Sequence, residues 1–479
     1  MTAVQTTEQP SEESFGRQSR IIAFVVAVSF FMQVLDGTIV TTSLPQMAAS
    51  FGVVPVAMSI GITVYLLTMS AFVPLAGWAG DRYGARRVFL ASIVIFTVAS
   101  LFCGLSGNLT EFVVARAVQG IGSALMTPVG RIIVLRSARK SDLVHAMSMI
   151  TWPALTAPVL GPVLGGYITT YLTWHWNFLI NIPIGIVGLG LVLRFVPDQR
   201  EEKVARLDLT GFFESAVGLT FLLAGLEFVV HGTTGLAASA GLIAVGVVFS
   251  IVATRHFLRV DAPLLDLSAF KIQTFAMATL SAGTASRVAI NATPFLLPLL
   301  FQVGFGLTAI NAGTYLLVYF AGNLGMKAIT TPMLKAFGFR SVLVVNGLIS
   351  SASIGCFALL SPSTPDWLTY ILLLCAGLSR SMNFTALNTL AFADIHAAQR
   401  SSASTLSSML QQVSLLLGVA VGAAVLNLSR TVHGGETLTP VDFRWAFIAI
   451  ALIGVVSSLR FLRLAHDAGA EVSRHNTRK

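Results

Sequence analysis

The stretch Ile21–Leu44, IIAFVVAVSFFMQVLDGTIVTTSL, is apolar, is long enough to cross a bilayer, and contains a single carboxylate, Asp36. At about 1.5 Å per helical residue, Asp36 lies about 22 Å from Ile21, past the middle of a hydrocarbon core about 30 Å thick. Placing a charge at that depth costs at least about 2.5 to 3.5 kcal/mol. We therefore expect Asp36 to face water, to pair with a cation or to hold a proton.

The rest of the chain has the same apolar character. Of its 479 residues, 55% are hydrophobic and 11% are charged, whereas soluble domains are about 25% charged. The apolar runs are continuous rather than alternating, so they predict helices and not barrel strands. The sequence therefore predicts an all-α polytopic membrane protein with fourteen spans, at residues 21–43, 57–80, 88–106, 111–133, 143–169, 176–195, 209–230, 236–256, 272–300, 309–331, 341–360, 367–391, 401–427 and 444–463.

The lysines and arginines predict the topology of these spans. With the amino terminus in the cytoplasm, 25 of the 30 basic residues fall on the inner side, Arg131 and Lys327 among them. Only Arg430 and Arg444 fall on the outer side, and three more arginines lie within spans. Both termini are therefore expected to be cytoplasmic. The net charge of +9 then reflects membrane topology rather than nucleic-acid binding.

The charged stretch DQREEKVARLD, at 198–208, divides the chain into two bundles of spans. The loops that follow the second and tenth spans form a weak internal repeat, because Gly84 and Gly338 are each followed by a basic residue two places on. The predicted organisation is a tail at 1–20, a six-helix bundle at 21–197, a linker with two additional spans at 198–256, a second six-helix bundle at 257–465 and a tail at 466–479.

No motif predicts enzymatic chemistry or a cofactor. The three cysteines lie inside apolar runs, the eight histidines have no ligand spacing, and no Gly-Lys-Ser/Thr phosphate loop is present. We therefore expect neither a metal nor coupling to ATP hydrolysis within this chain.

The loop after the second span reads GWAGDRYGARR from Gly77 to Arg87. A glycine permits close helix approach or a tight turn, and Asp81 can accept hydrogen bonds from a neighbouring helix end or an arginine. Asp81 and the Arg86/Arg87 cluster are predicted to latch the cytoplasmic side closed, while an ordinary positive-inside loop is the alternative. The predicted gating residues are Gly77, Asp81, Arg82, Gly84, Arg86 and Arg87.

This loop resembles the signature of the major facilitator superfamily, although Ala85 stands where the family usually has a basic residue. Three further stretches resemble motifs of its fourteen-helix drug:proton antiporters, the EmrB/QacA type: Leu35–Pro45, Arg116–Gly122 and Gly161–Gly166. The resemblance implies two six-helix bundles flanking a cavity, with two extra helices between them in sequence. It also implies proton-coupled export and proton handling at the Asp36 and Arg116 positions.

Depth alone gives Asp36 two candidate cations. Arg116 lies roughly 20 Å from the inner face, and Arg287 about 22 Å from it. Pairing with either could respond to protonation of Asp36, and a static buried ion pair that only fixes packing is the alternative.

The fifth span contains small residues four positions apart, with prolines beside them. Such a stripe allows tight helix contact, and in the antiporters this region is thought to control the conformational switch. A packing seam without a switching role is the alternative. The residues concerned are Ala157, Pro158, Gly161, Pro162, Gly165 and Gly166.

Four other polar residues within spans are candidates for the cavity between the bundles: Gln119, Glu227, Arg380 and Asn383. Glu227 lies near the outer end of the seventh span, where an interfacial, hydrated carboxylate is the alternative.

The predicted function is export of small lipophilic compounds, with Asp36 taking a proton from the outside and releasing it inside. An exporter of a specific metabolite on the same fold is the first alternative, and a transport-inactive sensor is the second. Few acids lie at depth against three arginines, so neutral or anionic cargo remains open. We expect a bacterial inner-membrane protein whose partners are cargo, protons and lipid, not nucleic acid; a periplasmic adaptor protein is left open.

Overall fold

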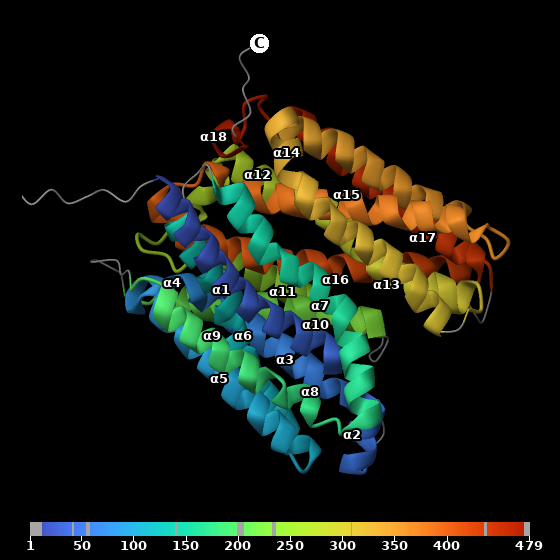
Figure 1. The fold of residues 1–479 in the computed structure, drawn as a ribbon, viewed down its shortest axis with the longest axis horizontal. Helices are drawn as coiled ribbons and strands as arrows, with labels where there is room; N and C mark the ends of the chain where they lie inside the picture. The colour runs from blue at the N-terminus through green and yellow to red at the C-terminus, as the bar shows by residue number, and fades with distance from the viewer. Residues whose placement is uncertain are drawn as a thin grey trace, which may run out of the picture.

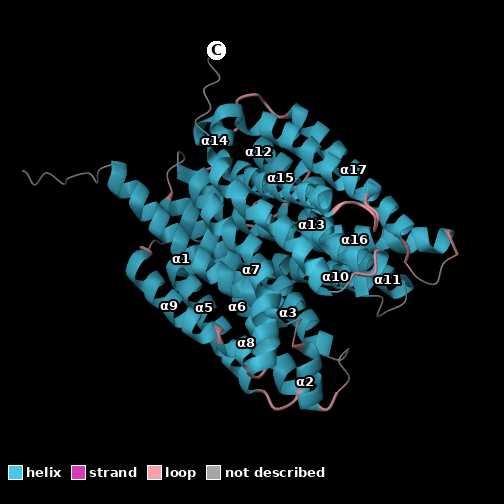
Figure 2. Ribbon diagram, turned by 45° about the vertical axis from the view of Figure 1, so that its right-hand side comes forward, coloured by secondary structure: helices cyan, strands magenta, loops and turns pink. Residues whose placement is uncertain are grey.

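The computed structural model describes residues 12–40, 43–53, 58–138, 142–198, 206–231, 236–307, 309–434 and 438–473. Throughout these residues the regular structure is helical and no β-strand occurs, as Figure 2 shows. The main helices are α1 (Glu12–Ile39), α2 (Leu44–Phe51), α3 (Ser59–Phe72), α4 (Ala76–Tyr83), α5 (Ala85–Leu105), α6 (Leu109–Ser137), α7 (Leu143–Tyr171), α8 (Trp176–Leu179), α9 (Asn181–Phe195), α10 (Leu209–His231), α11 (Leu236–Phe257), α12 (Gln273–Thr279), α13 (Ala282–Leu299), α14 (Ala309–Cys356), α15 (Asp366–Ala393), α16 (Arg400–Val432), α17 (Pro440–Arg460) and α18 (Ala470–Ser473).

Eleven helices in the described part of the chain are long and apolar enough to cross a membrane. One of them, Asn311–Leu359, is 49 residues long and contains Gly338 with a φ of 72°. A left-handed residue interrupts the helix there, so this segment forms two spans. With α7 and the α12–α13 segment, the helices are consistent with the fourteen predicted spans.

The two loops of the predicted internal repeat share this backbone conformation. Gly84 has a φ of 89° at the junction of α4 and α5, and Gly338 has a φ of 72° inside α14. A side chain would strain the backbone at either position, which is why glycine occupies both.

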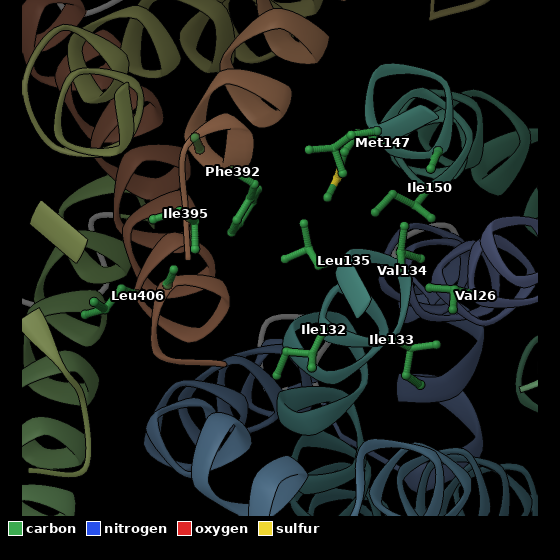
Figure 3. Packing of buried hydrophobic residues seen from close by; sticks show 14 of the residues in the cluster. Val26, Ile132, Ile133, Val134, Leu135, Met147, Ile150, Phe392, Ile395 and Leu406 are labelled. Atoms are coloured by element: carbon green, nitrogen blue, oxygen red, sulfur yellow. The ribbon is translucent and has the colours of Figure 1, made fainter. Parts of the chain in front are cut away.

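Helices α1–α9 form one half of the molecule, and α12–α17 form the other beside it (Figure 1). A continuous cluster of buried apolar side chains joins the two halves at the predicted cytoplasmic end. It includes Leu135 of α6, Met147 of α7, Phe392 of α15 and Leu406 of α16, which Figure 3 shows together. Inserted helix α10 contacts both α3 and α16, so it also links the halves.

The start of the inserted pair is held by Asp208. Its carboxylate accepts hydrogen bonds from Gly211 N at 2.9 Å and Leu264 N at 3.3 Å, and it contacts His256 Nε2 at 2.9 Å. Burial opposes ionisation, but these hydrogen bonds outweigh it and lower the pKa of Asp208 below its ordinary value. Asp208, the last residue of the charged stretch 198–208, therefore anchors the start of α10.

Helix α1 extends into the predicted amino-terminal tail. Helix α1 begins at Glu12, so the second half of the predicted tail at 1–20 is helical, while residues 1–11 lie outside the described part. Ser19 Oγ donates to Ser137 O at 2.7 Å, which fixes the start of α1 against the end of α6. This tertiary contact had no signal in local hydropathy.

Candidate functional site

Asp36 and Arg116 form an ion pair in the interior of the amino-terminal half. Arg116 Nη1 lies 2.6 Å from Asp36 Oδ2, and the two side chains are 1% and 0% exposed, respectively. Helix α1 supplies the acid and α6 the base, so the contact predicted from their similar depth is present. The pair is shielded from water. Burying two charges costs free energy unless their remaining donors and acceptors form hydrogen bonds.

Neutral side chains complete the hydrogen bonding of this pair. Asp36 Oδ1 accepts from Gln119 Nε2 at 3.0 Å and from Asn181 Nδ2 at 2.9 Å. Gln119 follows Arg116 by three residues on α6, so both face α1, and Gln119 Oε1 accepts from Arg116 Nη1 at 2.6 Å. Gln119 therefore belongs to the ion-pair site, not to a separate group of cavity residues.

Asn181 was not identified from the sequence. It is the first residue of α9, is fully buried, and also donates to Ser100 Oγ of α5 at 2.9 Å. The one sequence feature that could have pointed to Asn181 is an amide side chain within an apolar run, but no neighbouring residue indicated that Asp36 is its partner. Tyr65 of α3 was missed as well; the Arg116 guanidinium lies 4.2 Å from the centre of its ring.

Arg287 does not join this site, contrary to the expectation from its depth. Its guanidinium donates to Ala278 O at 2.5 Å and to Asn388 Oδ1 at 3.2 Å, both in the carboxy-terminal half. Depth along a helix gives only one coordinate, and α13 does not bring Arg287 to α1. The proposed pairing of Arg287 with Asp36 is therefore wrong for this structure.

The small-residue stripe of α7 packs directly against α1 two residues beyond Asp36. Thr38 Oγ1 lies 3.3 Å from Ala157 O, and a methyl group added at Gly161 would lie about 2.1 Å from the same hydroxyl oxygen. Ala157 is fully buried, and Gly165 is buried one turn beyond Gly161. The side-chain environments of positions 158, 162 and 166, the predicted Pro158, Pro162 and Gly166, lie outside what the structure describes.

We expect Gly161→Val to disrupt the α1–α7 contact. Overpacking of this kind costs about 1 to 3 kcal/mol, and here it would also displace the helix that carries Asp36. Thermal unfolding of the purified protein should show the loss of stability, and transport should fall with it. Gly37→Ala is the matched control on α1, because an added methyl group meets no atom within 4 Å there; equal stability of the two variants would contradict the prediction.

The predicted gate connects the two halves through Asp81. Its Oδ1 accepts from Arg136 Nη2 of α6 at 2.6 Å and from Ser401 Oγ of α16 at 2.5 Å. A methyl group at Gly77 would lie 2.9 Å from Thr405 Oγ1 of the opposite half. One turn further along α16, Ser404 Oγ donates to Pro128 O at 2.8 Å. Asp81 and Gly77 thus lie where the halves meet at the predicted cytoplasmic end.

The basic part of the predicted latch lies elsewhere. Arg86 donates to Leu193 O at 2.6 Å, and Arg87 pairs with Asp198 at 3.0 Å. Both contacts stay within the amino-terminal half, because α5 turns away from the seam after Gly84. Arg82 is exposed at the end of α4. The prediction that Arg86 and Arg87 latch the two halves is therefore wrong for this structure, and Asp81 forms the contact between them.

Asp81→Asn should weaken closure of this end. A hydrogen bond to a charged group contributes about 1.5 to 3 kcal/mol, so the ratio of closed to open molecules should fall about tenfold or more. The measurement is the alkylation rate of Ser404→Cys in a background without the three native cysteines, which should rise. Arg87→Gln, which removes a charge from the same loop within one half, should leave the rate unchanged; an unchanged rate in Asp81→Asn would exclude the latch.

The remaining candidates lie apart from the Asp36 site. Glu227 is buried on α10. Asn383 Oδ1 accepts from Asn346 Nδ2 at 2.9 Å, which joins α15 to α14. The Arg380 guanidinium lies 6.0 Å from the ring centre of Tyr319. Asn383 thus has an interhelical packing contact, and Arg380 lies beside an aromatic ring.

Two residues assigned to the inner side from the basic-residue count lie instead between the halves. Arg131 is 4% exposed inside α6 and donates to Ser407 Oγ of α16 at 3.2 Å. Lys327 Nζ of α14 donates to Thr151 Oγ1 of α7 at 2.9 Å. Each lies near the inner end of its apolar run in the sequence, so the count of basic residues could not distinguish it from a residue of the adjoining loop. The excess of basic residues on the predicted cytoplasmic side persists without them.

Comparisons with known proteins agree over nearly the whole chain. A family model described as Major Facilitator Superfamily matches residues 26–419. A protein of Escherichia coli (strain 55989 / EAEC), provisionally named multidrug resistance protein MdtD, is 37% identical over 459 residues, which cover 94% of this chain and 96% of that protein. A protein of the same name from Shigella boydii serotype 18 is 36% identical over 461 residues, with the same coverage.

Solved structures show the same fold at low sequence identity. The human organic anion transporter MFSD10 (TETRAN) aligns with a TM-score of 0.62, covering 95% of this chain and 100% of its own. The proton:xylose symporter XylE aligns with a TM-score of 0.61, covering 97% of this chain and 99% of its own. Both are 13% identical to this chain, so the likeness concerns the fold alone.

Proposed function

Because the chain belongs to the major facilitator superfamily, we propose that it exports small lipophilic compounds by alternating access and takes up protons in exchange. The observation that supports proton coupling is the fully buried Asp36–Arg116 pair. The side chains that form it and hydrogen-bond to it come from α1, α6 and α9. The names of the relatives from Escherichia coli and Shigella boydii support drug-like compounds as cargo.

In the proposed cycle, protonation of Asp36 weakens its attraction to Arg116. The arginine then keeps Gln119 Oε1 at 2.6 Å and Gly61 O at 3.4 Å as acceptors, so its charge is not left bare. The neutral acid no longer holds α1 and α6 in one arrangement. The described state, closed at the predicted cytoplasmic end through Asp81, is the one in which Asp36 would receive a proton from the opposite side.

The proposed orientation places both termini in the cytoplasm of a bacterium and the chain in the inner membrane. It rests on the excess of lysine and arginine at one end of the bundle. Proton uptake from the outside and release to the inside then provides the free energy for export.

Inverted vesicles that contain the full-length protein test this function. A lipophilic dye added to energised vesicles should accumulate inside them and release protons, and a protonophore should abolish the accumulation. Accumulation that is unchanged in the presence of the protonophore would refute proton coupling.

An exporter of one specific metabolite is the second candidate. It is favoured by the polar contact between the halves that Lys327 makes with Thr151, because polar groups that hydrogen-bond a substrate select for a defined polar cargo. Growth inhibition in a pump-deficient host, measured with drugs and with metabolites separately, distinguishes the two. Protection against a single metabolite and no drug would favour this candidate.

A further inference from the structure

Four cations in or next to the contact between the halves, away from the Asp81 gate, have no acidic partner among the described residues. No Asp or Glu occurs from Leu267 to Pro365, a range that includes all of α12, α13 and α14. The single acid in α15 is Asp366, its first residue. These cations are Arg131, Arg287, Lys327 and Arg380, each of which is buried or half-buried.

The first pair of cations, Arg131 and Arg287, is held by neutral groups. Arg131 donates to Ser407 and Ser408, and the Gln411 side-chain oxygen accepts from it in either orientation of that amide. Arg287 donates to Ala278 O and Asn388 Oδ1, and it experiences repulsion from Arg131. These are dipoles rather than counter-charges, so the local charge stays positive.

The second pair, Lys327 and Arg380, is partly accessible. Lys327 Nζ donates to Thr385 Oγ1 at 2.6 Å and to Thr151 Oγ1 at 2.9 Å. An ammonium group has three donors, so one remains. Arg380 repels Lys327, and its Nε has no hydrogen-bond partner. Lys327 also touches both halves, since Thr151 belongs to α7 and Thr385 to α15.

The two pairs are contiguous on α15. Thr385 contacts Lys327 and Asn388 contacts Arg287. Residues three apart lie on one helix face, about 5 to 6 Å from each other. Buried donors without partners occur here too, namely Arg287 Nε and Asn388 Nδ2. Donors and positive charge therefore exceed acceptors along this face, and a carboxylate, which only accepts, is the group that would balance them.

The depth of the second pair argues against a lipid headgroup as its partner. Lys327 precedes the break in α14 at Gly338 by 11 residues, which is about 16 Å of helix, and Arg380 precedes Ala393, the last residue of α15, by 13 residues, which is about 20 Å. Headgroups lie at the membrane surface, outside a hydrocarbon core of about 30 Å. The anion must arrive as part of a solute that enters between the halves.

We propose that the cargo is a small lipophilic organic anion whose carboxylate binds Lys327 and Arg380 between the two halves. This inference rests on the proposed export function and specifies its substrate class. Because Lys327 contacts both halves, a bound anion would change the interaction between them as the transporter switches.

Two dyes on the same xanthene ring test the charge preference, namely fluorescein, which is anionic near neutral pH, and rhodamine 123, which is cationic. Purified full-length protein in proteoliposomes with an imposed proton gradient should move fluorescein about tenfold faster than rhodamine 123. Lys327→Gln and Arg380→Gln should each lower fluorescein flux about tenfold or more, since each removes one partner of a charge pair. Arg444→Gln, an exposed arginine of α17, is the matched control and should change neither flux.

Faster movement of rhodamine 123 by the wild type, or full fluorescein flux in Lys327→Gln, would overturn the anion site. Fluorescein binding, measured by anisotropy with the purified proteins, decides the case if neither dye moves: wild-type binding lost in Lys327→Gln supports the site, and absence of binding overturns it. Fluorescein flux that ignores the proton gradient would refute the proposed coupling and leave the anion site standing.

Discussion

Asp36→Asn is expected to abolish gradient-driven accumulation of cargo. A charge moved through 100 mV provides about 2.3 kcal/mol, which sustains roughly a fiftyfold concentration ratio per coupled proton. An amide in place of this carboxyl group cannot take up a proton, so the ratio in inverted vesicles should fall from that order towards one. The amide retains the size of the carboxylate and can still accept from Arg116, so the fold should be kept, with a loss of stability because Arg116 no longer has a counter-charge.

Two measurements make this result specific. Counterflow, in which cargo exchanges down its own gradient, should persist in Asp36→Asn, which shows that the variant is folded and mobile. Asp198→Asn, which removes a carboxylate paired with Arg87 at the surface, should accumulate cargo like the wild type. Full accumulation in Asp36→Asn would remove Asp36 from the coupling step.

The second large effect concerns Arg116→Gln, which leaves Asp36 buried without its counter-charge. Removing one partner of a buried pair costs about 3 to 5 kcal/mol, and unfolding of the purified protein should show a loss of that order. Gln119 and Asn181 still donate to Asp36, and protonation of the acid would recover part of the loss. Arg87→Gln breaks an exposed pair instead and should cost at most about 1 kcal/mol.

The double variant Asp36→Asn/Arg116→Gln separates the static interpretation from the functional one. If the two charges interact, stability should recover by several kcal/mol relative to Arg116→Gln, because no buried charge remains. Gradient-driven accumulation should stay absent. A double variant that accumulates cargo normally would show that the pair only fixes packing.

The bounds of the spans were predictable to within a few residues at most ends. The sixth span was expected at 176–195, and a membrane-length helix occupies Trp176–Phe195. Long apolar runs are local features, so each helix could be identified without knowing its neighbours. The start of α1 was not predictable, because residues 12–20 are polar and their helix is fixed by contact with α6.

The site prediction was limited because the sequence does not show toward which neighbour each helix directs its side chains. Arg116 and Arg287 have similar depths, yet only Arg116 reaches Asp36. Asp81 contacts a residue 320 positions away, whereas Arg86 and Arg87 turn to α9 and the segment after it. Sequence spacing gives no rotation or tilt for a helix relative to another, so these choices were open.

By itself the sequence determined that this chain lies in a membrane as many helices and that an acid and a base lie at matching depth. Those facts follow from hydropathy and from a fixed rise per residue, which act within single segments. Only the tertiary structure decided that Asn181 completes the Asp36 pair and that, among the described residues, Lys327 and Arg131 lie between the halves without acidic partners. Such contacts depend on how separate helices rotate and pack against each other, and no single segment contains that information.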